Sequence, residues 1–151
     1  MKNVSGGYGR KQVLYNIDAV FESNMITSVI GKNGCGKSTL LQMCCGLLTP
    51  SEGSITIDGV DIANIKHADL AKKISYLSQS HSAGSITVRS LVSHGRFPYL
   101  GYPRKYSSED KRKIADAMEL AEVTDIADKY ANELSGGQLQ RALLGRAIIS
   151  K

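Results

Sequence analysis

The sequence predicts an α/β fold in which a sheet core is followed by a helical part. Short β-branched apolar runs alternate with helical patterns over the first half of the chain, as they do in α/β cores. A glycine-rich stretch joins one of these runs to a helix, and the later half shows mainly helical patterns. We therefore expect an α/β core over residues 1–79 and a helical subdomain over residues 80–151, in a chain long enough for a real core.

The core is expected to alternate strands with helices. Strand patterns occur at residues 13–17, 26–30, 54–57 and 74–77. Helical patterns occur at residues 37–48 and 68–73. This order predicts a sheet core of the α/β type.

Helix signals dominate after residue 79. Residues 87–96 can form a helix, and the segment 107–110 (SSED) has the pattern of a helix start. The apolar residues that follow it have i, i+3, i+4, i+7 spacing: Ile114, Ala117, Met118 and Ala121. A last helix is expected after residue 135, with an apolar face formed by Leu139, Ala142, Leu143 and Ala147.

Residues 31–39 (GKNGCGKST) match the pattern G-x-x-x-x-G-K-[ST] of a phosphate-binding loop, or P-loop. The apolar run 25–30 precedes the loop and a helical pattern follows it, which is the context that such a loop requires. Three glycines can take positive φ and leave room for a phosphate against the main chain: Gly31, Gly34 and Gly36. The alternative, a plain strand-to-helix connection, does not explain the fixed glycines, lysine and hydroxyl.

The P-loop predicts a nucleoside triphosphate and Mg²⁺ as ligands. Backbone N–H groups of the loop, including those of Asn33 and Cys35, would point at the phosphates beside the positive end of the helix dipole. Lys37 would bridge the β- and γ-phosphates. Ser38 would offer its hydroxyl to Mg²⁺, and Thr39 would donate toward the α-phosphate.

A second candidate anion site lies in residues 134–141 (LSGGQLQR). Here a serine and two glycines again stand at the start of a predicted helix, with the candidate residues Ser135, Gly136, Gly137 and Gln138. One nucleotide does not need two γ-phosphate sites in one chain, so this segment favours a head-to-tail dimer in which each copy caps the nucleotide of the other. The alternative is an ordinary capped helix, because Ser135 is a good N-cap.

With LSGGQ following a P-loop, the chain resembles the nucleotide-binding domain of ABC-type ATPases. The resemblance implies a P-loop NTPase core with an inserted helical signature subdomain, and ATP and Mg²⁺ as cofactors. It implies that Gln79, which ends the run 75–79 (SYLSQ), contacts Mg²⁺ and the attacking water. It also implies that Tyr8 stacks on adenine, with Tyr15 as the alternative.

The same resemblance implies an ATP-hydrolysing subunit that powers an ABC membrane importer. Residues 85–99 are most similar to ATPases of importers for iron-siderophore, haem or cobalamin complexes. Such a subunit pairs with a second nucleotide-binding domain and membrane-spanning permease subunits, peripherally, at the cytoplasmic face of the plasma (inner) membrane. Aromatic residues of the loop 97–103 would either anchor the permease or pack the helical subdomain.

Two other functions are compatible with parts of the sequence. In the family, an apolar strand ending in Asp-Glu (Walker B) and a switch histidine follow the signature helix, and residues 1–151 do not contain them. The chain alone is therefore expected to be a fragment that binds nucleotide weakly and hydrolyses little, or a non-hydrolytic nucleotide-binding remnant. An ABC-type ATPase acting on nucleic acid is disfavoured, because those proteins separate the two motifs by a long coiled coil.

Composition adds few constraints. The net charge of +5 has a local source in residues 104–113, which favours a solvated helix face, with contact to anionic lipid headgroups as an alternative. Aromatic interleaving of the kind found in RNA-binding segments does not accompany this charge, so no nucleic-acid partner is expected. The three cysteines, Cys35, Cys44 and Cys45, are expected to be free thiols, and no metal ligand is assigned among the histidines.

Overall fold

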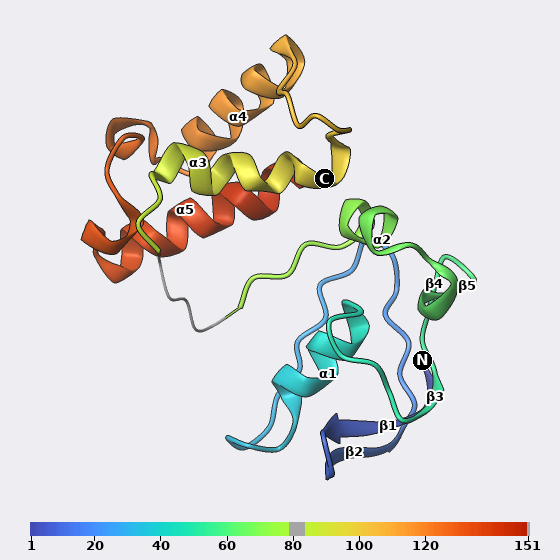
Figure 1. Cartoon of the computed structure of the whole chain (residues 1–151). Helices are drawn as coiled ribbons and strands as arrows, with labels where there is room; N and C mark the ends of the chain where they lie inside the picture. Colours follow the sequence, from blue (N-terminus) through green and yellow to red (C-terminus); the bar gives the residue numbers. More distant parts are fainter. Residues whose placement is uncertain (79–83, 151) are drawn as a thin grey trace. The chain divides into compact units, whose positions relative to one another are not determined.

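The computed structural model describes residues 1–78 and 84–150 and divides the chain into two compact units. Met1–Leu70 forms a unit of short strands and helices, and the unit that begins at Ala71 is helical (Figure 1). The α/β fold class predicted from the sequence is confirmed. The boundary between core and helical subdomain that we place after residue 79 stays a prediction, and that residue lies outside the described ranges.

A small antiparallel sheet organises the first unit. Its order is β2 (Lys11–Ile17), β1 (Lys2–Tyr8), β3 (Glu52–Ser54). The turn between β1 and β2 places Tyr8 opposite Lys11 at the tip of this hairpin. A second hairpin pairs β4 (Thr56–Ile57) with β5 (Val60–Asp61), and a 3-10 turn over Ile62–Asn64 follows it.

Helix α1 (Lys37–Cys44) packs against this sheet. The core of the unit contains buried residues from the sheet, from α1 and from the chain before β4: Val4, Leu14, Met43 and Ile55. Strand β1 passes close to α1, because a Cβ at Gly6 would lie 2.4 Å from the Met43 Cε. The helix ends earlier than predicted because Gly46 has a φ of 68°, a left-handed conformation that terminates helices.

Two of the predicted strands are wrong. The segments 26–30 and 74–77 form no strand, and the apolar side chains of the first are open to solvent, with Ile26 99% and Ile30 92% exposed. A strand in an α/β core is held by hydrogen bonds to a neighbour on the sheet. Within the described residues neither segment has such a neighbour, so apolar character alone does not make them strands.

Three helices build the second unit: α3 (Val88–Ser93), α4 (Ser108–Leu120) and α5 (Gly136–Ile149). Helix α2 (His67–Lys73) spans the boundary between the units. The region predicted as a helix at 87–96 is α3 continued by a 3-10 helix over His94–Tyr99. Further 3-10 turns cover Thr124–Ile126 and Ala131–Glu133.

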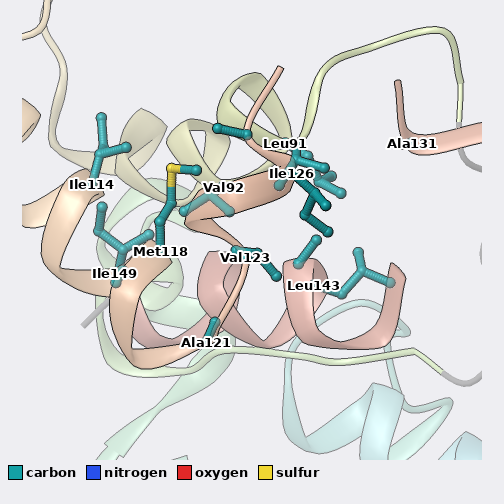
Figure 2. Packing of buried hydrophobic residues seen from close by; sticks show 14 residues of the cluster. Leu91, Val92, Ile114, Met118, Ala121, Val123, Ile126, Ala131, Leu143 and Ile149 are labelled. Atoms are coloured by element: carbon teal, nitrogen blue, oxygen red, sulfur yellow. The ribbon is translucent and has the colours of Figure 1, made fainter. Parts of the chain in front are cut away.

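The core of the helical unit lies between α3, α4 and α5, whose apolar side chains point toward one another (Figure 2). The predicted apolar face of α4 is confirmed, because its four residues are all buried: Ile114, Ala117, Met118 and Ala121. Gly145 of α5 lets the helices approach closely, since a Cβ there would lie 3.2 Å from the Ala121 Cβ and 3.3 Å from the Val92 Cγ2.

Candidate phosphate-binding site

The P-loop lies between the segment 25–30, which forms neither helix nor strand, and α1. Gly34 has a φ of 81° and Gly36 a φ of 100°, which confirms the prediction that these positions use the conformational freedom of glycine. Gly31 does not have a positive φ, so close packing and not backbone conformation favours glycine at that position. A Cβ at Gly31 would lie 2.7 Å from the Cys35 Sγ.

The first turn of α1 is left open to an anion. Its N-cap is Gly36, which has no side chain to satisfy the first N–H groups, and the turn contains no acidic residue. These N–H donors and the positive end of the helix dipole therefore face the loop without a capping partner from a side chain. Gly36 also packs closely against β2, because a Cβ there would lie 2.8 Å from the Leu14 Cδ2.

The Lys37 ammonium lies across the loop. Its Nζ donates hydrogen bonds to the Gly31 and Lys32 carbonyl oxygens, both at 2.8 Å, and lies 3.9 Å from the Cys35 Sγ. Ser38 is exposed beside it, whereas Thr39 is buried. The loop thus gathers a cation, a hydroxyl and uncapped N–H groups, which is a donor set suited to a phosphate chain.

Tyr8 is brought to the same helix. Its hydroxyl donates a hydrogen bond to the Gln42 Oε1 of α1 at 2.7 Å, and 49% of the residue remains exposed. The hydroxyl of Tyr15 donates instead to the Gln12 carbonyl oxygen of its own strand at 3.3 Å. The structure therefore favours Tyr8 over Tyr15 as the aromatic residue near the P-loop helix.

Sequence reasoning missed Gln42. A polar residue on an exposed helix face is ordinary, and only the fold of the β1–β2 hairpin brings Tyr8 to it. The only sequence signal was its position in the second turn of the P-loop helix, which is too general to single out one residue.

The second candidate anion site belongs to the helical unit. Ser135 caps α5 by accepting from the Gln138 N–H at 3.3 Å, and the Gln138 Oε1 accepts from the Ser135 N–H at 3.0 Å. The ordinary capped helix is therefore present. Gly136 and Gly137 are nevertheless exposed, with open space where a Cβ would stand, so a ligand can reach the start of α5.

The structure tests the prediction for the cysteines but not the prediction for Gln79. Gln79 lies outside the described residues, so its predicted contact with Mg²⁺ and water stays a prediction. The cysteines are free thiols, as expected. Burial raises the pKa of the Cys44 thiol, and burial together with the Cys44 charge raises the pKa of Cys45 to about 11.

The described ranges 1–78 and 84–150 show two further features. They contain no group of three or more His, Cys, Asp or Glu side chains that could hold a metal ion by themselves. The same ranges contain no helix long and apolar enough to cross a bilayer.

Comparison with known proteins identifies a family. A family model described as "ABC transporter" matches residues 14–151. The petrobactin import ATP-binding protein YclP of Bacillus subtilis is 42% identical over 149 residues, which cover 98% of this chain and 58% of that protein. The ferric enterobactin transport ATP-binding protein FepC of Escherichia coli is 36% identical and is covered to 53%. The chain thus spans little more than half the length of these relatives.

Solved structures share the fold. The dimeric structure of a bacterial ABC transporter cassette superposes with a TM-score of 0.83 at 28% identity and covers 99% of this chain and 68% of that one. A post-hydrolysis dimer of such a cassette, bound to ADP and Pi, gives a TM-score of 0.81 at 25% identity, with the same shares covered.

Proposed function

This chain belongs to the ABC transporter family, and on that premise we propose that it binds Mg·ATP at residues 31–39 as part of the subunit that powers a membrane importer. The single observation that carries this proposal is the uncapped N-terminus of α1 beside the Lys37 ammonium. Within the described residues, no side-chain hydrogen bond caps the start of this helix, so no side-chain cap competes with an anion there.

Each P-loop residue has a distinct task in this proposal. Gly34 and Gly36 let successive N–H groups converge on the phosphates. The Lys37 ammonium leaves the carbonyl oxygens of Gly31 and Lys32 and pairs with the β- and γ-phosphates, where the charge is greater. Ser38 supplies a hydroxyl ligand to Mg²⁺, which when bound neutralises charge on the phosphates.

Hydrolysis is proposed to need two copies. The exposed Gly136 and Gly137 at the start of α5 would meet the γ-phosphate held by the P-loop of the other copy, with Ser135 and Gln138 beside them. Support comes from the related cassettes, which were solved as dimers. Gln79 is proposed to contact Mg²⁺ and the attacking water, a role that rests on the family resemblance.

The proposed cargo is an iron-siderophore complex, with haem or cobalamin complexes as the wider class. The names of the relatives from B. subtilis and E. coli, which concern petrobactin and ferric enterobactin, support this choice. We propose that the subunit docks on permease subunits at the cytoplasmic face of the plasma membrane. In the loop 97–103, Tyr102 is fully exposed and supports this docking. Tyr99 remains 36% exposed, although its ring packs under the Arg96 guanidinium, whose Cζ lies 3.8 Å from the ring centroid.

Calorimetric titration of the chain with Mg·ATP tests the proposal. Lys37→Ala is expected to weaken binding at least tenfold, because it removes a charge-assisted contact. Lys66→Ala is the matched control, since it removes an exposed lysine of the same unit that lies outside residues 31–39. Equal affinities of wild type and Lys37→Ala would contradict the proposal.

A further inference from the structure

The hydrogen bond between Tyr8 and Gln42 joins two parts of the first unit that are far apart in sequence. Tyr8 ends β1 at the tip of the hairpin, and Gln42 lies in α1, whose first turn forms the phosphate site. The donor is the Tyr8 hydroxyl and the acceptor is the Gln42 Oε1, at 2.7 Å. The hairpin tip is thus tied to the same helix that begins at Gly36.

The tip needs such a tie because its own backbone is permissive. Gly9, directly after Tyr8, has a φ of 57° and open space around it, so the turn alone does not fix the tyrosine. Gly7, directly before it, lies tightly against β2, since a Cβ there would lie 2.0 Å from the Lys11 carbonyl oxygen. The backbone is therefore tightly packed before Tyr8, at Gly7, and unconstrained by neighbours after it, at Gly9.

We propose that Gln42 is a positioning residue for the nucleobase, which holds the Tyr8 ring at a fixed distance from the P-loop. The inference rests on the proposed function, in which Tyr8 stacks on adenine. About half of Tyr8 stays exposed while its hydroxyl is bound, so a stacking surface remains open. Without the bond the ring would sample other rotamers, and stacking would then cost the entropy of ordering it.

The test compares ATP with tripolyphosphate, which occupies a phosphate site but has no base. Gln42→Met keeps the length of the side chain and removes the acceptor, and we expect it to weaken Mg·ATP binding about two- to tenfold while tripolyphosphate binding is unchanged. Gln42→Glu keeps an acceptor oxygen and should restore the ratio of the two affinities. A purely structural role of Gln42 would lower both affinities together and would not be rescued.

Two companion variants complete the experiment. Tyr8→Phe keeps the ring and loses the donor, so it should lower the ratio of Mg·ATP to tripolyphosphate affinity as much as Gln42→Met does. The double variant should lower this ratio no further than either single variant. Tyr15→Phe is the matched control, because it removes from the same sheet a phenol hydroxyl that donates to the Gln12 carbonyl oxygen of its own strand. Its affinity ratio should equal that of the wild type.

The outcomes separate the inference from the proposed function. If Tyr8→Ala lowers the ratio of ATP to tripolyphosphate affinity but Gln42→Met does not, the role of Gln42 is overturned and the function stands. If Tyr8→Ala leaves the ratio unchanged, adenine does not stack on Tyr8 and the positioning role falls with that contact. If Tyr15→Phe lowers the ratio as much as Tyr8→Phe does, the loss is not specific to the Tyr8–Gln42 hydrogen bond and the role of Gln42 is overturned. A wild-type chain that binds neither ligand overturns both proposals.

Discussion

Arg96 and Asp110 form a buried ion pair that joins the 3-10 helix after α3 to the first turn of α4. The Arg96 Nε donates to the Asp110 Oδ1 at 2.8 Å, and their side chains are only 8% and 11% exposed. The other carboxylate oxygen of Asp110 accepts from the backbone N–H and the hydroxyl of Ser107, the N-cap of α4. One carboxylate therefore starts a helix and neutralises a buried guanidinium.

Removal of this carboxylate is expected to destabilise the helical unit strongly. Asp110→Ala should lower the free energy of unfolding by about 3 kcal/mol or more, because a buried charge loses its partner and α4 loses its capping box. Urea unfolding followed by circular dichroism measures the change. Asp116→Ala is the matched control, since Asp116 forms an exposed pair with Arg112 at 3.8 Å that should contribute about 0.5 kcal/mol or less. Equal losses for the two variants would contradict the account.

The same carboxylate predicts an acid-dependent loss of stability. Hydrogen bonds from the Ser107 side chain and backbone, with a further contribution from Arg96, hold the pKa of Asp110 below its usual range. A lowered pKa in the folded state gives a stabilisation that is complete above about pH 4 and is lost as the pH falls through the folded pKa. The difference in the free energy of unfolding between wild type and Asp110→Asn should therefore shrink as the pH falls below about 4. A difference that stays constant as the pH falls below that point would exclude Asp110 as its source.

Gly36 is expected to be intolerant of any side chain. Gly36→Ala combines strain at a φ of 100° with a Cβ 2.8 Å from the Leu14 Cδ2, so we expect a loss of about 2 to 4 kcal/mol. Gly59→Ala controls for strain alone, because Gly59 has a φ of 79° and open space around it, and should cost about 1 to 2 kcal/mol. Thermal unfolding measures the loss of stability in each variant relative to wild type. The packing of α1 on β2 would be disproved if Gly59→Ala were the more damaging change.

The three thiols are expected to differ in reactivity. Cys35 is exposed in the P-loop, whereas burial raises the pKa of Cys44 and, with the Cys44 charge added, that of Cys45 to about 11. The thiolate is the reactive form, so iodoacetamide at pH 8 should label Cys35 first, by mass spectrometry of peptides. Mg·ATP should slow this labelling. Faster labelling of Cys45 would contradict the effect of its burial. Labelling of Cys35 that Mg·ATP does not slow would contradict the placement of the ligand.

Local signals were sufficient for much of the fold. The helix starts at Ser107 and Ser135 and the apolar face of α4 were predictable, because capping and periodicity act within a few residues. The segment 26–30 was predicted wrongly, because a strand of this kind depends on neighbours distant in sequence. The candidate site shows the same division. The P-loop could be predicted from its motif, whereas the contact between Tyr8 and Gln42 could not, because it forms only when the hairpin folds.

The most direct test of the central claim is an NMR titration of the chain with Mg·ATP, followed through assigned backbone amides. We expect the largest shift changes at the amides of residues 33–39, with a further change at Tyr8, because the ligand would sit on the uncapped start of α1. Lys37→Ala should suppress these changes. Saturating Mg·ATP that leaves these amides unmoved, or that moves only residues elsewhere in the chain, would show that this loop is not the nucleotide site.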